Sequence, residues 1–261
     1  MPIIISAPHA QTKITDKKMR KRFALSDYQI WKCSDPFTSK LKQFNCAKYI
    51  QIAKTHRLVC DFNRPPNEKA FHDKDFFGNK VFKKGEQFKK KEQKENLEKY
   101  WHPYHNKLKK KILKLDSKTK DKATLIIDFH NTSGDHPLTK QHQYMPSIVI
   151  SNLGKQNTGR SNKNHTSISA KNLQFFQNSI KQHLPLSVEI NEIFHGGYNT
   201  LWFHELSHEL KTKTKIYALQ LEYNLDHVFN PLSKRLDNKA LRTLHQGLNK
   251  AIQELFEKLN K

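Results

Sequence analysis

Two apolar runs in this sequence each stop at a histidine. The first, Ile3-Ile4-Ile5, leads into Pro8-His9, and the second, Leu125-Ile126-Ile127, leads through Asp128 into His130. Short uninterrupted runs of branched residues are typical of buried strands. Open α/β sheets bind ligands at the carboxyl ends of their strands. We therefore expect the two imidazoles to meet at one edge of a sheet, where they could share a metal ion.

The remaining apolar positions predict strands that alternate with helices. Short apolar or alternating runs predict strands over 49–53, 58–62, 147–151, 187–191 and 216–223. Helical spacing predicts helices over 100–115, 170–184 and 236–259, and one that opens at Asp35-Pro36 with Phe37, Leu41 and Phe44 on one face. The lysine–glutamate run from 83 to 99 indicates a solvated helix or a mobile segment, and 155–167 indicates a surface loop. This order of elements favours a three-layer α/β/α domain over residues 1–261.

The charge balance of the 261-residue chain is strongly basic. It has 47 Lys and Arg residues against 24 Asp and Glu, a formal net charge of +23. Such an excess attracts nucleic acids, anionic membrane surfaces and acidic small molecules. The lysines are spread along the chain, and no RNA-binding, helix-turn-helix or zinc-finger motif accompanies them, so we interpret them as surface composition. A protein that binds nucleic acid or another anionic surface stays an alternative.

The cysteines and the N-terminus give indications of the cellular compartment of the protein. Cys33, Cys46 and Cys60 are widely spaced and form no CxxC pair. An odd set without a pairing pattern argues against a disulfide framework and a structural zinc cluster, and favours a reducing compartment. The N-terminus lacks the features of a signal peptide, and no stretch has the length of a membrane span. We therefore expect a soluble cytoplasmic protein.

Seven short motifs occur in the order found in one hydrolase family. They are Pro8-His9-Ala10, Ser26-Asp27-Tyr28, Asp61-Phe62-Asn63-Arg64-Pro65, Pro103-Tyr104-His105, Asp128-Phe129-His130, the stretch from Asn191 to Tyr198, and Leu219-Gln220-Leu221-Glu222-Tyr223-Asn224. With these motifs the chain resembles the N-formylglutamate amidohydrolases, a zinc hydrolase family related to the carboxypeptidase-like exopeptidases. The resemblance reaches to about Asn230. It implies a mixed central sheet of the zinc-exopeptidase (phosphorylase/hydrolase-like) type.

The resemblance also implies a role for each matching residue. His9, Asp27 and His130 would bind one Zn²⁺ and leave an open position for water. Glu222 would be the general base, and Asp128 would support His130 from the same face of its strand. The substrate contacts would be Asn63, Arg64, Asn191, Gly196, Gly197 and Tyr198. Arg64 would grip a carboxylate with its forked guanidinium.

The implied reaction is hydrolysis of the N-acyl amide of a small acidic amino acid. The foremost substrate is N-formyl-L-glutamate, which would give formate and L-glutamate. Two positions depart from the family pattern: Gln11 stands where glycine often follows the first histidine motif, and Asn131 stands where serine commonly follows the second. Neither is an implied ligand or base, so they bear on which acyl group the pocket accepts.

A second metal motif competes with this interpretation. His204-Glu205-Leu206-Ser207-His208 spells HExxH, the zincin signature, in which two histidines on one helical face bind zinc and the glutamate is the base. The apolar residues around it predict a helix. No metzincin extension follows, and Glu222, the nearest candidate for a third ligand, lies in a predicted strand. A zincin-type metallopeptidase is therefore another alternative.

Overall fold

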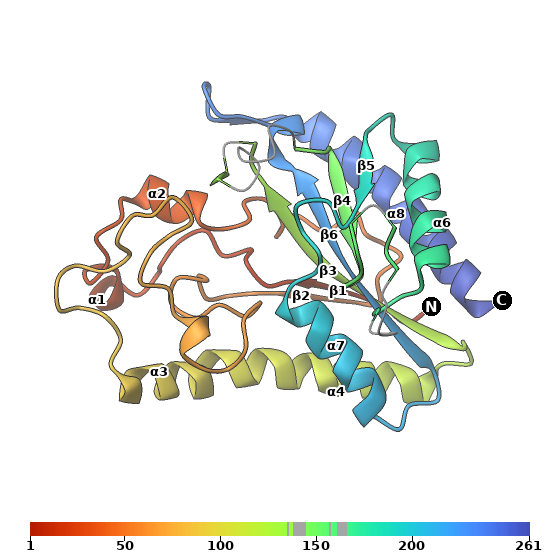
Figure 1. The fold of residues 1–261 in the computed structure, drawn as a ribbon, viewed down its shortest axis with the longest axis horizontal. Helices are drawn as coiled ribbons and strands as arrows, with labels where there is room; N and C mark the ends of the chain where they lie inside the picture. Colours follow the sequence, from red (N-terminus) through yellow and green to blue (C-terminus); the bar gives the residue numbers. More distant parts are fainter. Residues whose placement is uncertain (135, 138–144, 157, 161–165) are drawn as a thin grey trace.

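In the computed structural model, six strands form one mixed sheet in the order β2-β1-β3-β6-β4-β5 (Figure 1). The structure describes residues 1–134, 136–137, 145–156, 158–160 and 166–261. The strands are β1 (Ile3–Ala7), β2 (Tyr49–Ile52), β3 (Ala123–Thr132), β4 (Ile148–Ser151), β5 (Val188–Ile190) and β6 (Lys215–Asn224). Strands β2, β1, β3 and β6 run parallel, whereas β4 is antiparallel to β6 and parallel to β5. The expected mixed sheet is confirmed.

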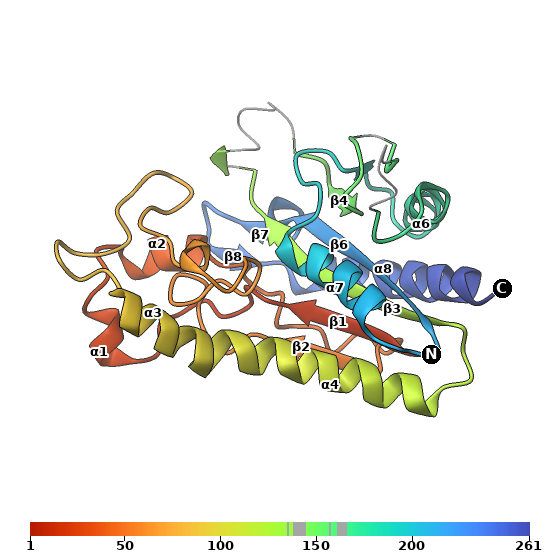
Figure 2. The same cartoon turned by 60° about the horizontal axis from the view of Figure 1, so that its bottom comes forward.

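Helices cover both faces of this sheet. Helices α4 (His102–Lys118) and α7 (Tyr198–Glu209) lie on one face, and α6 (Ala170–His183) and α8 (Asn238–Asn260) on the other (Figures 1 and 2). Side chains alternate along a strand, so Ile3 and Ile5 of β1 enter the α6–α8 core while Ile4 enters the α4–α7 core. The predicted α/β/α layering is confirmed. Among the described helices, none combines the length and apolar character needed to cross a membrane.

Shorter elements fill the connections. They are α1 (Lys17–Arg20), α2 (Asp27–Lys32), the 3₁₀ turn η1 (Glu68–Ala70), α3 (Lys90–Asn96), the π-helical turn η2 (Leu97–Trp101), the 3₁₀ turn η3 (Leu225–His227), and the hairpin of β7 (Phe229–Asn230) and β8 (Arg235–Leu236). A separate apolar cluster around Phe23, Phe82 and Phe88 packs together the loops that precede α3. These loops, red to yellow in Figure 1, bring residues to the carboxyl ends of β1 and β3.

Two predicted elements are absent. Residues 35–44 form turns because Phe37 has a left-handed backbone, with φ of 69°, and because the Asp35 carboxylate contacts His130 instead of capping a helix. Residues 58–62 also form turns, in which the Val59 and Cys60 N–H groups donate to the His56 carbonyl. Apolar side chains of both segments, among them Leu41, Phe44 and Val59, are buried, so these apolar runs reflect packing outside regular elements. The predicted loop over 155–167 lies partly outside the described residues.

His245 of α8 is a titratable group inside the α6–α8 core. Its ring lies 5.0 Å from that of Phe44 and 6.0 Å from that of Phe129, and burial lowers its pKa to about 4. The pKa of histidine in an unfolded chain is about 6.5. We expect the contribution of neutral His245 to stability to be complete above about pH 6.5. As the pH falls to about 4, it should be lost by up to about 1.4 kcal/mol per pH unit.

Denaturant titrations of the wild type and His245→Leu at several pH values check this expectation. Between about pH 6.5 and 4.5 the variant should lose less unfolding free energy than the wild type, because it has one proton fewer to take up on unfolding. The comparison concerns the slope, so a change in stability at neutral pH does not affect it. Equal slopes in the two proteins would contradict the prediction.

Candidate metal and active site

The sheet face covered by α4 and α7 becomes polar at its carboxyl end. The parallel pairing of β3 with β6 sets His130 opposite Glu222 and Asp128 opposite Gln220. Residues two apart on a strand share a face, so these four side chains project on one side. His9 comes two residues after the end of β1, which pairs with β3. The strand order therefore gathers His9, His130 and Glu222, as the sequence predicts for the two histidines.

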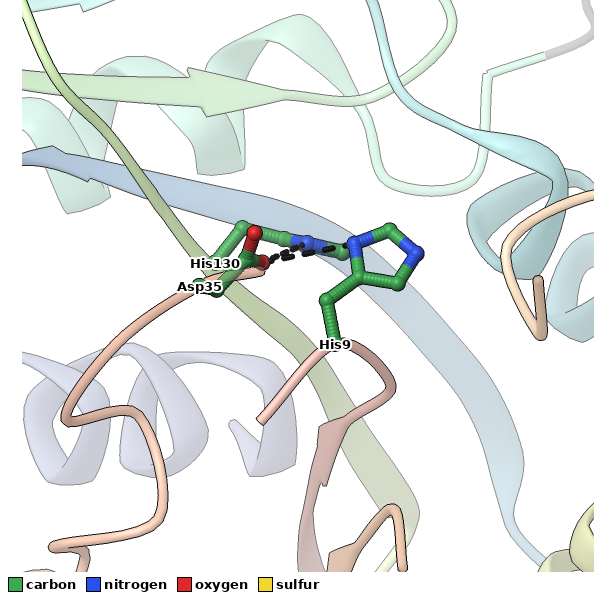
Figure 3. Close-up of side chains that lie close together, drawn as sticks. All are labelled: His9, Asp35 and His130. Atoms are coloured by element: carbon green, nitrogen blue, oxygen red, sulfur yellow. Dashed lines mark hydrogen bonds and ion pairs between the residues drawn. The ribbon is translucent and has the colours of Figure 1, made fainter. Parts of the chain in front are cut away.

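His9, Asp35 and His130 form a buried cluster (Figure 3). The Asp35 Oδ2 atom lies 2.6 Å from Nδ1 of His130 and 3.4 Å from Nδ1 of His9. Burial by itself would raise the pKa of Asp35, but the two imidazoles outweigh it and lower that pKa. Burial would lower the pKa of His130, but the carboxylates of Asp128 and Asp35 raise it well above its usual value. The Asp35 carboxylate and the His130 imidazole thus each stabilise the charged form of the other.

A further buried carboxylate, that of Asp61, orients His9. Its Oδ1 accepts a hydrogen bond from Nε2 of His9 at 2.8 Å. Its Oδ2 accepts from Nη2 of Arg57 at 2.7 Å and from Nε2 of His72 at 2.8 Å. Burial would raise the pKa of Asp61, but the charges of Arg57 and His9 hold it well below its usual value. This arrangement turns Nδ1 of His9 toward Asp35.

Asp128 orients His130 in the same manner. Its Oδ2 accepts from Nε2 of His130 at 3.0 Å, which is the expected contact between these two residues. Its Oδ1 accepts from Nδ2 of Asn199 at 3.2 Å, and Oδ1 of Asn199 accepts from Nε2 of His105 at 3.0 Å. The chain of contacts ties β3 to α7 and α4. His130 is therefore fixed by elements of three parts of the fold.

The chemistry of this cluster fits a divalent metal ion. Two imidazoles and one carboxylate can hold a catalytic zinc ion and leave a position open. Each imidazole is oriented by a carboxylate on the ring nitrogen that faces away from the cluster, as is usual for metal-binding histidines. Among the described residues, Nδ1 of His9 has no hydrogen-bond partner and only the longer 3.4 Å contact with Asp35, and a cation would satisfy it. Over the described ranges, no other three His, Cys, Asp or Glu side chains come so close together.

Glu222 lies beside this cluster with both oxygens held. Its Oε2 accepts from the Thr132 hydroxyl at 2.9 Å and its Oε1 from Nε2 of Gln220 at 3.0 Å. Burial raises the pKa of Glu222 to about 7, although the charge of His130 opposes this rise. A carboxyl group with a pKa near neutrality both accepts and returns protons readily at neutral pH. Glu222 therefore has the properties of a general base.

A cavity of about 410 Å³ opens onto all of these groups. Its lining includes His9, Asp35, His130 and Glu222 together with the predicted substrate contacts Asn63, Arg64, Gly196 and Gly197. A Cβ atom on Gly197 would lie 2.3 Å from Nδ2 of Asn63, so the absence of a side chain at Gly197 lets the Asn63 amide take its present position. The carbonyl of Arg64 accepts from the Trp101 indole at 3.0 Å, while its side chain is exposed. The cavity thus combines a candidate metal site with a positive side chain.

Asp27 does not reach this site. It lies in the first turn of α2, its side chain is 91% exposed, and it forms an ion pair with Arg20 at 2.8 Å. Helix α2 ends at Lys32, and the turn that follows brings Asp35 to the histidines instead. The expected position of Asp27 beside the two histidines is therefore wrong, and the carboxylate that lies against them is that of Asp35.

Two predicted substrate contacts also lie outside the cavity lining. Asn191 is fully buried, and its amide bonds to Asn152 and to the carbonyl of Lys155. It therefore shapes the loop before α7 rather than touching a ligand. The ring of Tyr198 packs at the α4–α7 core, 6.1 Å from that of Trp101. The structure thus gives both side chains packing contacts away from the cavity lining, where they had been expected.

The HExxH motif forms the helix that its pattern predicts. His204 and His208 share a face of α7, with ring centroids 4.8 Å apart. Within the part of the chain that the structure describes, no third His, Cys, Asp or Glu completes a ligand set there. Glu222, the candidate third ligand, lies in the cavity instead. The zincin alternative has no support from this geometry.

Three residues of the site carry no assigned role in the sequence interpretation. Asp35 has no site role in the sequence interpretation because an Asp-Pro pair is also typical of the start of a helix. Asp61 lies inside a quoted motif, and Arg57 precedes it by four residues. Their ion pair forms across a turn, where no helical or strand spacing signals it in the sequence.

One protein-family model and two solved structures are similar to this chain. A family model described as N-formylglutamate amidohydrolase matches residues 1–228. The fold is similar to that of N-formylglutamate amidohydrolase from Ralstonia eutropha JMP134, with a TM-score of 0.76 and 12% identity, over 99% of this chain and 94% of that one. The fold is also similar to that of a gene product from Agrobacterium tumefaciens, with a TM-score of 0.66 and 15% identity. This similarity covers 99% of this chain and 90% of that one. A search of curated proteins found no match.

Proposed function

Since the chain belongs to the N-formylglutamate amidohydrolase family, we propose that it is a zinc-dependent enzyme that hydrolyses N-formyl-L-glutamate to formate and L-glutamate. The observation that supports this proposal most directly is the buried set of His9, Asp35 and His130, which opens into the same cavity as Glu222 and Arg64. That cavity joins a candidate Lewis-acid site, a base and a carboxylate-binding side chain, which are the groups that this hydrolysis needs.

The three residues of the cluster would hold the zinc ion. His9 and His130 would bind through Nδ1 and Asp35 through its carboxylate, while Asp61 and Asp128 keep the imidazoles oriented. When bound, the ion would polarise the amide carbonyl and lower the pKa of a water molecule to about 7.

Glu222 would move the proton that the reaction transfers. It would take a proton from the attacking water and deliver it to the nitrogen of the departing glutamate. Its hydrogen bonds from Thr132 and Gln220 keep the carboxylate in one orientation. The raised pKa of about 7 makes Glu222 a stronger base than an exposed carboxylate, whose pKa is lower, so it takes the proton from water more readily.

Arg64 would hold a carboxylate of the substrate. Pro65 and Pro66 restrict the backbone after it, and Trp101 binds its carbonyl. We expect Arg64→Lys to raise KM for N-formyl-L-glutamate about tenfold with a much smaller change in kcat, because lysine keeps the charge but loses the bidentate fork. Arg22→Lys is the matched control, since Arg22 pairs with Glu92 outside the cavity. Steady-state formate release measures both constants, and a loss confined to kcat would contradict this role.

The proposed function is tested by removing the metal. Protein treated with a chelator should lose formate release, and zinc should restore it at about one ion per chain. Elemental analysis gives the metal content, and a formate assay gives the rate. Zinc binding without any formate release would contradict the proposed substrate. Release that persists in metal-free protein would contradict the metal dependence.

A further inference from the structure

An aromatic groove continues from the catalytic cavity. A second cavity, of about 510 Å³, shares Tyr28, Trp31 and Phe229 with the first, and Phe37 lines only the second. These four residues are termed the aromatic groove. The catalytic cavity alone has a volume in the range of pockets for drug-sized ligands, which begins near about 300 Å³. A formyl group, with its single carbon, offers the aromatic groove no apolar surface to bind.

The rings of the groove are arranged as a surface for another apolar group. Tyr28 stacks on Trp31 with centroids 5.9 Å apart and an angle of 11° between the rings. Phe229 lies 5.1 Å from Trp31 and 5.7 Å from Phe37. Tyr28 is nevertheless 46% exposed, and Trp31 and Phe37 are only partly buried. Partly exposed aromatic rings that line a concave site offer both stacked and edge contacts to an aromatic or aliphatic ligand.

The backbone of Phe37 has an unfavourable conformation that this arrangement requires. Its φ of 69° lies in the left-handed region, which is unfavourable for a bulky side chain. Such strain persists only where the surroundings impose it, and it concentrates at binding sites. Here it sets the Phe37 ring against Phe229 in the second cavity. The left-handed backbone thus fixes the Phe37 ring as part of the groove.

The groove and Arg64 lie toward opposite sides of the sheet. Trp31 and Phe37 pack against the α6–α8 core, whereas the Arg64 carbonyl is bound by Trp101 of the α4–α7 core. A substrate whose carboxylate meets Arg64 would cross the catalytic groups with its amide and extend its acyl side into the groove. Lysines Lys13 and Lys234 at the second cavity disfavour a cationic acyl group.

We propose that the natural substrates are acidic N-acyl amino acids with an aromatic or long aliphatic acyl group, which lies in the aromatic groove. This inference rests on the proposed function, whose metal site, base and Arg64 it keeps, and extends the range of acyl groups beyond formyl. With N-phenylacetyl-L-glutamate, hydrolysis would break the amide C–N bond and add the water oxygen to the acyl carbon. A proton would move to the nitrogen, so that phenylacetate and L-glutamate form without another reactant.

Three substrates and three variants test the proposal on the zinc-loaded protein. N-phenylacetyl-L-glutamate should exceed N-formyl-L-glutamate in kcat/KM by at least about tenfold, given the apolar area that the phenyl ring would bury. This ratio should fall at least about fivefold in Tyr28→Ala and in Phe37→Gly. Glycine suits the left-handed backbone, so the second variant removes the ring without adding strain. Leu113→Ala, an exposed apolar residue of α4 outside both cavities, should leave the ratio unchanged.

The third substrate, N-formyl-L-phenylalanine, distinguishes the two sides of the amide. If it is the best of the three, the groove binds the amine side and the proposal is overturned. A preference for N-formyl-L-glutamate, or an unchanged ratio in both groove variants, overturns the proposal while the proposed function stands. If none of the three substrates is cleaved by protein with full zinc occupancy, the proposed function itself has failed.

Discussion

Asp35→Asn should abolish zinc binding and formate release, whereas Asp27→Asn should leave both at the level of the wild type. Asp35 is the carboxylate that lies against both histidines, and the loss of one of three protein ligands should weaken zinc binding by more than the 10- to 100-fold that supporting residues contribute. Asp27 is 91% exposed and pairs only with Arg20 in the described structure, so its change should affect at most that surface ion pair.

The measurement is zinc content after dialysis against buffered zinc, with formate release on the same samples. Asparagine keeps the size of the side chain, so Asp35→Asn tests the ligand with little change in packing. Circular dichroism and thermal unfolding of both variants show whether the fold is kept. Zinc loss in Asp27→Asn together with full occupancy in Asp35→Asn would contradict the assignment and restore the ligand set implied by sequence.

The histidines of the site are predictable because their information is local. Each follows an apolar run typical of a buried strand, and the carboxyl ends of parallel strands converge in the sheet. The alternation of Leu219 and Leu221 with Gln220 and Glu222 predicts Glu222 on the polar face of its strand, and the structure sets it opposite His130. For these residues, the pattern of the strand fixes both the place and the direction of the side chain.

Asp35 is different because its role depends on contacts distant in sequence. Its partner His130 lies 95 residues away, and between α2 and Asp35 the chain turns in a way that no periodic pattern encodes. The left-handed Phe37 follows directly and prevents the helix that Asp35-Pro36 would otherwise begin. A carboxylate eight residues earlier, Asp27, satisfied the family motif but points to solvent. Loop geometry, rather than composition, decides between the two.

Glu222→Gln should lower kcat/KM for formate release by about 10²- to 10⁴-fold, the usual contribution of a general base, while zinc stays bound. Glutamine is nearly isosteric and can still accept a hydrogen bond from Thr132 or Gln220, so the cavity should persist. It cannot take a proton from water. Activity and zinc content should therefore separate in this variant, whereas they fall together when Asp35 is changed.

Glu205→Gln is the matched control, because Glu205 is the base that the HExxH motif would use. It is exposed on α7 and does not line the catalytic cavity, so this variant should keep the activity of the wild type. Parallel measurement of zinc content and formate release in the two variants then assigns the base. If Glu205→Gln is inactive and Glu222→Gln is active, the reaction takes place on α7 and the role of the sheet edge is refuted. The reverse pattern ties the chemistry to the paired strands β3 and β6, where His130 and Glu222 face one another.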